Sequence, residues 1–98
     1  MIEFQNFSDI PDGFTGTCKI LTRYYYYLEN KYEIKYDIIH FLNRKYHKED
    51  GPAYEEQTGS IYWYYKGEEY GENNDFTIES WKEKVECLKR EEELKIFI

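Results

Sequence analysis

Cysteine, proline and long apolar stretches are scarce in this sequence. Its 98 residues include two cysteines, two prolines and one methionine, and no CxxC pair occurs. Two isolated cysteines make no disulfide framework, and they are typical of free thiols in a reducing compartment. The N-terminal stretch lacks the basic and apolar regions of a signal peptide, and no apolar run approaches the roughly 20 residues of a membrane helix. We therefore expect a cytoplasmic protein with no membrane partner.

Basic residues are scarce in the second half of the chain. Residues 1–48 hold six acids and seven bases, whereas residues 49–93 hold fourteen acids and five bases, and the whole chain has a net charge of −7. Phosphate binding depends on Lys and Arg, so the acidic half is a poor direct ligand for nucleic acid. A basic protein partner would suit it. Solubility alone explains the acidity equally well.

The sequence contains no recognisable set of catalytic residues. It has no glycine-rich phosphate loop, and Cys18 lies in TCKIL, a strand-like segment where a cysteine acts as a small buried hydrophobe. We expect the same of Cys87, beside Leu88. A nucleophilic pair of Cys18 with His40 or His47 is the less favoured alternative. The acid pairs 55–56 and 68–69 are adjacent, so in strands they point to opposite faces. We expect no enzymatic activity and no cofactor.

Aromatic residues are abundant, at 20% of the chain, and twelve of them are tyrosines. Tyrosine suits a half-buried sheet, because its ring packs while its hydroxyl reaches water. Turn-type residues divide the aromatic segments from one another. The sequence predicts strands at 17–21, 23–29, 32–42, 53–56 and 61–66, an N-terminal loop at 1–16, a tight turn at 30–31, a polar connection at 43–52, a turn at 57–60 and a loop at 67–75.

The C-terminal segment has helical features. Thr77 is a good N-cap, and Phe76 and Trp81 are placed to form a hydrophobic staple across it. A stripe at helical spacing follows: Ile78, Trp81, Val85 and Leu88. The sequence predicts a helix over about 77–94 that packs on the sheet through this stripe. The expected fold is a single α+β domain, 1–98, in which about five antiparallel strands form a meander of stacked hairpins (17–66) with one C-terminal helix on a face.

The segment YHKEDGPAYEE (46–56) combines a histidine, acids and a Gly-Pro pair. Gly51 offers a positive φ and Pro52 fixes its own, which predicts a turn that resets the strand direction. His47 would then form hydrogen bonds between neighbouring hairpins. The alternative is a metal site of His47, Glu49 and Asp50, with His40 as a fourth ligand. Because a metal site needs convergent ligands with supporting partners, we prefer the turn and expect no metal.

The strand-like segment IYWYY (61–65) has two different faces. Alternation places Ile61, Trp63 and Tyr65 together, and Tyr62 and Tyr64 on the opposite side. One set should meet the helix stripe. The other should be exposed or covered by residues 1–14. Exposed tyrosines among acids make a plausible protein-binding surface, and ordinary sheet packing is the alternative.

An internal repeat connects three segments. YYLENKY (26–32), FLNRKYHKEDGPA (41–53) and YYKGEEYGEN (64–73) each start with two aromatic or aliphatic residues, continue through turn-type or charged residues, and reach a tyrosine. A pattern of strand, turn and strand predicts stacked hairpins rather than a helical array.

Residues 41–70 resemble the MORN-like repeats of small bacterial and bacteriophage proteins, whose unit runs approximately W-Y-L-N-G-K-x-H-R-E-D-G-P-A. His40 and Arg44 depart from the unit, which has Trp and Gly at these positions. The resemblance implies a hairpin repeat and a bacterial or phage setting, and it says little about activity, because such repeats serve many roles. The matching positions are Phe41, Leu42, Asn43, Lys45, His47, Glu49, Asp50, Gly51, Pro52 and Ala53, followed by Trp63, Tyr64 and Gly67.

We expect a non-catalytic acidic binding protein. The preferred hypothesis is a phage or mobile-element inhibitor of a host defence protein, anti-CRISPR-like, that blocks a basic nucleic-acid-binding surface in the cytoplasm of a bacterial host cell. The alternatives are an immunity or antitoxin protein that caps a basic toxin, and a structural repeat module that self-associates through a strand edge. The oligomeric state is open. The candidate partner-binding residues are Glu49, Asp50, Glu55, Glu56, Tyr62, Tyr64, Glu68, Glu69, Glu72 and Asp75, and His47, Gly51 and Pro52 are expected to shape the turn.

Overall fold

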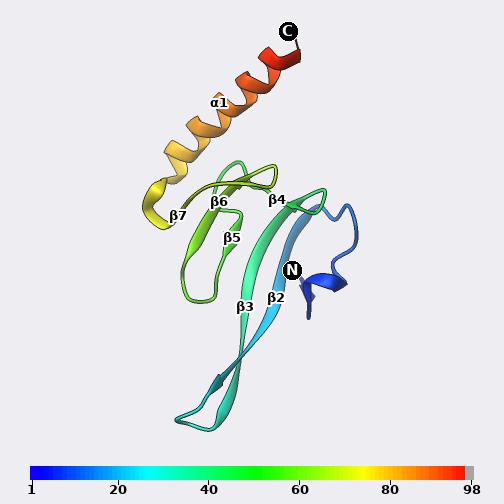
Figure 1. Ribbon diagram of the computed structural model, residues 1–98, viewed down its shortest axis with the longest axis vertical. Coiled ribbons are helices and arrows are strands. Elements are labelled where there is room, and N and C mark those ends of the chain that lie inside the picture. The colour runs from blue at the N-terminus through cyan, green and yellow to red at the C-terminus, as the bar shows by residue number, and fades with distance from the viewer. Residues whose placement is uncertain (97–98) are drawn as a thin grey trace.

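A computed structural model describes residues 1–96, with the side chains of 22–24 and 96 left out. Within these residues, seven strands form one open sheet, and a single α-helix follows at the C-terminus (Figure 1). The α+β class, the mostly antiparallel sheet and the C-terminal helix are confirmed. The elements are β1 (Ile2–Phe4), β2 (Gly16–Tyr26), β3 (Lys31–Leu42), β4 (Lys45–Tyr46), β5 (Tyr54–Glu55), β6 (Ile61–Tyr65), β7 (Glu68–Glu72) and α1 (Ile78–Ile96), with 3₁₀ turns at Phe7–Asp9 and Asn73–Asp75.

The sheet has more strands than the predicted five. Its order is β1-β2-β3-β5-β6-β7, with β4 paired to the end of β3, and every pairing is antiparallel except that of β1 with β2. The predicted strands 17–21 and 23–29 are one strand, β2. The predicted N-terminal loop 1–16 contains β1 and a 3₁₀ turn, and the predicted loop 67–75 contains β7. These short strands were missed because β1 has only three residues and β7, EEYGE, is mostly acidic, so neither contains a run of alternation long enough to predict a strand.

Two hairpins use the same kind of two-residue turn. Asn43 and Arg44 connect β3 to β4, with φ of 50° and 64°, and Lys66 and Gly67 connect β6 to β7, with φ of 49° and 88°. Positive φ at both central positions is the geometry of a type I′ hairpin turn. These turns occupy equivalent places in the segments 41–53 and 64–73. The two segments therefore share a local structure as well as a sequence pattern.

The expected turn at Asp50-Gly51-Pro52 differs from the prediction. Gly51 is buried and does not have a positive φ. The chain instead follows β6 closely: the Lys48 amide donates to the carbonyl of Tyr64 (3.4 Å) and the Ala53 amide to that of Tyr62 (3.0 Å). The atoms nearest to a Cβ on Gly51 would belong to the flexible Lys48 side chain, at 3.6 Å. The positive φ values lie in the hairpin turns on either side of this connection.

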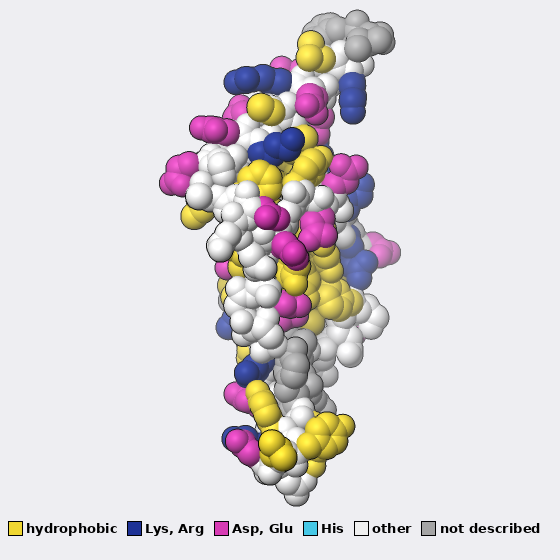
Figure 2. Space-filling view, turned by 60° about the vertical axis from the view of Figure 1, so that its left-hand side comes forward, with side chains coloured by type: hydrophobic (Ala, Val, Ile, Leu, Met, Phe, Trp, Pro, Cys, Tyr) yellow, Lys and Arg dark blue, Asp and Glu magenta, His cyan; other side chains and the backbone are white. Residues whose placement is uncertain are grey.

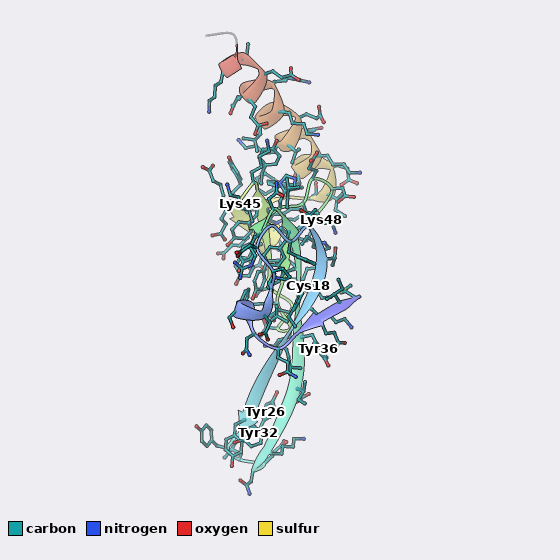
Figure 3. All side chains as sticks on the ribbon, turned by 90° about the vertical axis from the view of Figure 1, so that its right-hand side faces the viewer. Cys18, Tyr26, Tyr32, Tyr36, Lys45 and Lys48 are labelled. Atoms are coloured by element: carbon teal, nitrogen blue, oxygen red, sulfur yellow. The ribbon has the colours of Figure 1, made fainter. Side chains whose placement is uncertain are left out.

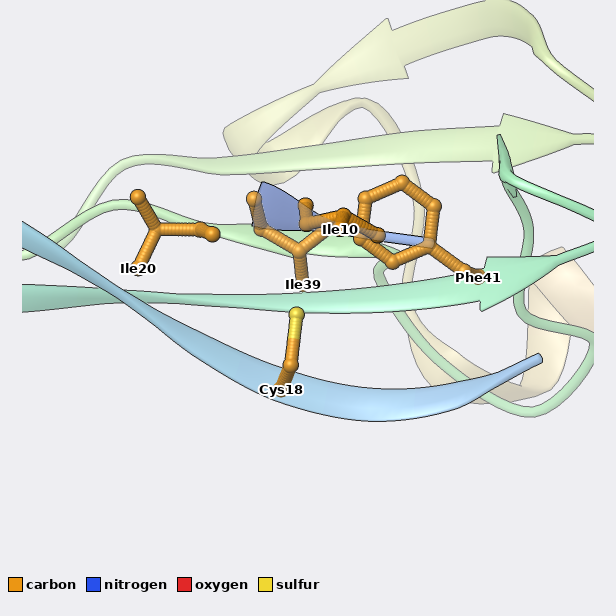
Figure 4. Close-up of a cluster of buried hydrophobic side chains, with 5 residues drawn as sticks. All are labelled: Ile10, Cys18, Ile20, Ile39 and Phe41. Atoms are coloured by element: carbon orange, nitrogen blue, oxygen red, sulfur yellow. The ribbon is translucent and has the colours of Figure 1, made fainter. Parts of the chain in front are cut away.

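The sheet has a separate hydrophobic cluster on each face. The N-terminal cluster consists of Ile10, Cys18, Ile20, Ile39 and Phe41 (Figure 4). Phe4 and Phe14 pack against it. The helix cluster consists of Trp63, Tyr65, Trp81, Val85 and Leu88, with Phe76 and Tyr70 beside it. Alternation along the strands assigns the two clusters to opposite faces, because a strand directs neighbouring side chains to opposite sides. Residues 1–14 pack on one face, and α1 packs on the other through Trp81, Val85 and Leu88 while its C-terminal end extends beyond the sheet (Figure 1).

Helix α1 begins as the sequence predicted. The Ser80 amide donates to Thr77 Oγ1 (3.1 Å), and the rings of Phe76 and Trp81 are 5.1 Å apart, which confirms the cap and the staple. The Trp81 side chain is fully buried, and its Nε1 donates to the Lys48 carbonyl at 2.8 Å. Val85 and Leu88 are also buried, as expected. Ile78, however, is 49% exposed, so three of the four stripe residues pack on the sheet.

The β2–β3 hairpin projects beyond the rest of the sheet (Figures 1 and 3). Strand β1 pairs with β2 only at residues 18–20, and β5 pairs with β3 only at residues 38–39. Among the described residues, no third strand pairs with the section between, 21–36, which we call the arm. The arm contributes to the elongated shape of the molecule, whose principal extents are 59 × 31 × 20 Å.

Candidate binding surface

Four tyrosines pack ring against ring on the sheet face that also bears the N-terminal cluster. Tyr46, Tyr54, Tyr62 and Tyr64 belong to β4, β5 and β6, and we call them the tyrosine face. Ring centroids are 5.4 Å apart for Tyr46 and Tyr54, 5.0 Å for Tyr46 and Tyr64, and 5.9 Å for Tyr54 and Tyr62, all edge-on. Edge-to-face packing holds each ring in a defined orientation. The result is a fixed, half-exposed aromatic surface.

A shallow concavity of about 290 Å³ lies on this face. Its lining consists of the four tyrosines together with Glu56 and Glu69. Register explains their convergence: Tyr64 pairs with Glu69 and Tyr62 with Glu72, so these carboxylates share the face of the tyrosines. Acidic and hydrophobic side chains lie next to each other over the middle of the molecule (Figure 2). Tyrosine rings and carboxylates both attract cations, so the concavity fits a lysine or arginine side chain of another molecule.

The buried carboxylate of Asp37 holds one residue of the tyrosine face in position. Asp37, on β3, is buried and accepts hydrogen bonds from the Tyr54 hydroxyl (2.7 Å) and the Gln57 amide (3.0 Å). Burial and the Asp37 carboxylate together raise the pKa of Tyr54 well above its ordinary value. Two hydrogen bonds satisfy a carboxylate that would otherwise be costly to bury. Asp37 therefore fixes the position of Tyr54 and of the turn that follows β5.

Nearby carboxylates act on the two predicted tyrosines. Partial burial raises the pKa of Tyr62, and Glu56 and Glu72 add to the rise. Partial burial also raises the pKa of Tyr64, with Glu69 as the next cause. The Tyr62 hydroxyl donates to Glu56 at 3.4 Å. Both hydroxyls stay protonated at neutral pH, so the negative charge of this surface comes from the carboxylates alone.

Three of the predicted carboxylates lie on the helix side of the sheet instead. Glu49 forms an ion pair with Lys89 of α1 and a hydrogen bond with His47 Nε2 (3.2 Å), and the hydrogen bond from Lys89 lowers the pKa of Glu49. Glu55 faces His40, at 3.6 Å, and Glu68 accepts a hydrogen bond from Tyr70 at 3.0 Å. The adjacent acids of the pairs 55–56 and 68–69 thus point to opposite faces, as the sequence predicted.

The last two candidate acids, Asp50 and Asp75, are exposed at loop positions. Asp75 accepts a hydrogen bond from the Glu72 amide at 2.8 Å, which stabilises the 3₁₀ turn after β7. The candidate set is therefore not one surface. Glu56, Glu69 and Glu72 adjoin Tyr62 and Tyr64, while the others are divided between the helix side and the loops.

His47 connects two hairpins, as expected. Its Nδ1 accepts a hydrogen bond from the Lys66 amide at 2.9 Å, its Nε2 faces Glu49, and its ring lies 5.0 Å from that of Tyr65. The imidazole thus holds the turn between β6 and β7 against the connection that follows β4. In the described part of the chain, no three His, Cys, Asp or Glu side chains come together in a group that could hold a metal ion.

The two cysteines have different environments. Cys18 is fully buried in the N-terminal cluster, as predicted, and burial raises the pKa of its thiol. A thiol with a raised pKa is a poor nucleophile at neutral pH. Cys87 is exposed on α1, so the expectation that it packs as a small hydrophobe is wrong. The stripe on α1 passes through positions 85 and 88, which leaves position 87 on the outer side.

Sequence reasoning missed half of the tyrosine face. Tyr46 lies in the segment predicted to be a polar connection. Tyr54 lies in a predicted short strand to which no binding role was assigned. Their contacts depend on the pairing of β3 with both β4 and β5, which brings segments 41–46 and 54–62 together. The tyrosine that recurs after the turn of each repeat segment was an available signal for Tyr46 but not for Tyr54.

No family model, curated protein or solved structure matches this chain. The resemblance to MORN-like repeats therefore stays a prediction. Within the described residues, no helix has both the length and the apolar composition needed to cross a membrane.

Proposed function

We propose that the protein is a non-catalytic binding protein whose tyrosine face and its carboxylates occupy a basic surface of a partner protein. A nucleic-acid-binding groove of a host defence nuclease is a surface of this kind, and a phage or mobile-element inhibitor in the bacterial cytoplasm is the role that we assign. The single observation that supports the proposal is the concavity lined by four tyrosines, Glu56 and Glu69.

Charge supports the same surface. Residues 49–76 hold eight acids and one base, Lys66, whereas α1 carries both signs in similar number. Glu49 and Glu55 face cationic or ionisable partners within the chain, while Glu56 and Glu69 receive hydrogen bonds or contacts from neutral groups. Within the described residues no ion pair joins Glu56 or Glu69 to a cation of the chain, so the negative charge of both can attract an incoming cation.

Rigid aromatic anchors support affinity as well. Interface hot spots are rich in tyrosine, because a large ring with few rotatable bonds loses little entropy on binding. The ring contacts of Tyr46, Tyr54, Tyr62 and Tyr64 already hold these side chains in place. Little ordering cost is left for the binding event.

The test uses two variants of equal charge. Glu56→Lys with Glu69→Lys changes the tyrosine face, and Glu83→Lys with Glu93→Lys changes exposed positions on α1. Each double variant replaces two negative charges by two positive ones. A fluorescent nona-arginine peptide serves as the probe of basic surfaces, and its affinity is measured by anisotropy at two salt concentrations.

We expect the first variant to lose at least tenfold in affinity and the second to lose much less. Wild-type affinity should fall as salt rises past about 0.15 M, where the screening length is about 8 Å. Equal losses in the two variants would mean that only net charge matters, and the proposal would then fail. Capture from a bacterial lysate by wild type, but not by the first variant, then identifies the partner by mass spectrometry.

A further inference from the structure

The arm exposes apolar side chains that the proposed binding surface does not use. Tyr32, Ile34 and Tyr36 lie on one face of β3 and are 73%, 56% and 37% exposed, and Tyr27 and Leu28 at the tip are more exposed still. Hydrophobic side chains gather at the tip of the arm, at the bottom of Figure 2. A soluble protein rarely leaves such a row uncovered unless something packs on it.

The same residues expose unpaired backbone groups. The His40 amide donates to the Ala53 carbonyl at 2.8 Å, so the backbone of His40 faces the outer edge of β3. Because hydrogen-bonding direction alternates along an antiparallel strand, the N–H and C=O groups of Tyr32, Ile34 and Tyr36 face that edge too. Among the described residues, no strand pairs with this edge before Ile38. An isolated two-stranded ribbon is only marginally stable in water, and a third strand would stabilise it.

We propose that two copies of this chain pair antiparallel through the β3 edges of their arms, with Ile34 opposite Ile34 at a two-fold axis. The proposal goes beyond the binding function above and does not depend on it. In this register Tyr32 of each copy lies opposite Tyr36 of the other. The Ile34 pair and the two Tyr32–Tyr36 pairs are hydrogen-bonded pairs, and together they form about six backbone hydrogen bonds. The two arms become one four-stranded sheet.

Charge complementarity favours this register, and it favours a second copy of the chain as the partner. On the other face of β3, Glu33 and Lys35 lie two residues apart, with their charged groups 3.9 Å from each other. Pairing centred on Ile34 places Glu33 of one copy opposite Lys35 of its partner, twice by symmetry. Opposite charges facing each other across strands are favourable, and like charges are unfavourable. A two-fold interface needs such self-complementarity.

The paired residues 32–36 stop before Ile38, where β5 joins β3, and the turn 27–30 of each copy then has to bend past the partner's β5. The arm also points away from α1 (Figure 1).

Association is measured on the full chain by sedimentation from about 1 to 200 µM. We expect Glu33→Lys alone and Lys35→Glu alone each to weaken dimerisation by about tenfold, because each sets like charges opposite one another. An equimolar mixture of the two variants should recover association close to wild type, since every cross-strand pair then has opposite charges. Glu29→Lys, outside the paired section, is the matched control and should leave dimerisation unchanged. Circular dichroism verifies that each variant is folded.

Three results would overturn the proposal: a monomer at every concentration, a dimer that both single variants leave intact, or a mixture that fails to recover association. A cross-link gives an independent readout. Ile34→Cys in a Cys87→Ser background should form an intermolecular disulfide, because paired Cα atoms are about 5.5 Å apart, within the range that a disulfide spans. Tyr27→Cys in the same background should not, and equal cross-linking of both would count against the register.

Discussion

The two faces of the sheet are covered in different ways. On one face, α1 supplies three buried side chains from a regular helix. The cluster there is mostly aromatic, and the ring centroids of Trp63 and Trp81 are 5.7 Å apart. On the other, residues 1–14 supply one buried side chain, Ile10, and the cluster beneath is mostly aliphatic. A continuous helix brings its side chains as a unit, whereas an irregular segment must order its backbone residue by residue. The helix side should therefore contribute more to stability.

Removal of α1 should have the largest effect. A chain ending before Thr77 loses Trp81, Val85 and Leu88, and burial of each large side chain contributes about 1.5–3 kcal/mol. Their sum is comparable to the whole free energy of unfolding of a small domain. We expect no cooperative thermal transition for residues 1–76 by circular dichroism. A cooperative melt near that of the full chain would contradict the importance that we give to the helix side.

Ile10→Ala should have a smaller but clear effect. Ile10 is buried in the N-terminal cluster, and truncation of such a side chain costs about 2–5 kcal/mol. We expect the lower part of that range, because an irregular cover can collapse into the space. Trp81→Ala, at about 3–5 kcal/mol, is the comparison on the other face. Denaturant unfolding of both variants measures the difference, and a larger loss for Ile10→Ala would reverse our ranking of the two faces.

Arg44 offers a finer test of the N-terminal side. Its Nη2 donates to the Phe7 carbonyl at 2.7 Å, and its φ of 64° is unfavourable for any residue with a Cβ. Glycine relieves that strain, while alanine does not, and both remove the hydrogen bond. Arg44→Gly should therefore be more stable than Arg44→Ala by about 1 kcal/mol. Equal stability in denaturant would show that the turn stores no strain.

The smallest effect concerns pH on the helix-bearing face. Burial, and then the Lys48 ammonium, lower the pKa of His40 below 6.5, and Glu55 acts in the opposite direction. The unfolded chain then binds the proton more readily, so the stability from neutral His40 is complete above pH 6.5 and is lost as pH falls through the lower folded pKa. The melting temperature should decrease from pH 7 toward pH 5.

His40→Gln should flatten that decrease. Glu49 and Glu92 have lowered pKa values, so their contributions are lost only below about pH 4.5 and fall in a separate window. An unchanged slope between pH 7 and pH 5 in the variant would assign the effect to another group.

The two faces of the sheet differ in how well their structure could be predicted from the sequence, and the reason is physical. The helix side has a local signature, because the cap at Thr77, the staple and the spacing of Trp81, Val85 and Leu88 all lie within residues 76–88. The cover of the N-terminal side has no period, and β1 exists only because it pairs with β2. Alternation likewise separated Tyr62 from Trp63 correctly. Tyr46 and Tyr54 joined Tyr62 through strand register, which is a long-range property.

Both tryptophans of the chain, Trp63 and Trp81, belong to the helix cluster. Indole emission therefore reports on one face of the sheet. Ten of the twelve tyrosines lie in the arm or on the tyrosine face and form a second chromophore population, while Tyr65 and Tyr70 accompany the tryptophans. Suppose that residues 1–14 detach before α1 does. During unfolding, the near-ultraviolet circular dichroism of tyrosine should then change first, and the tryptophan fluorescence should change later. The tryptophan and tyrosine signals can therefore be used to follow the unfolding of the two faces separately.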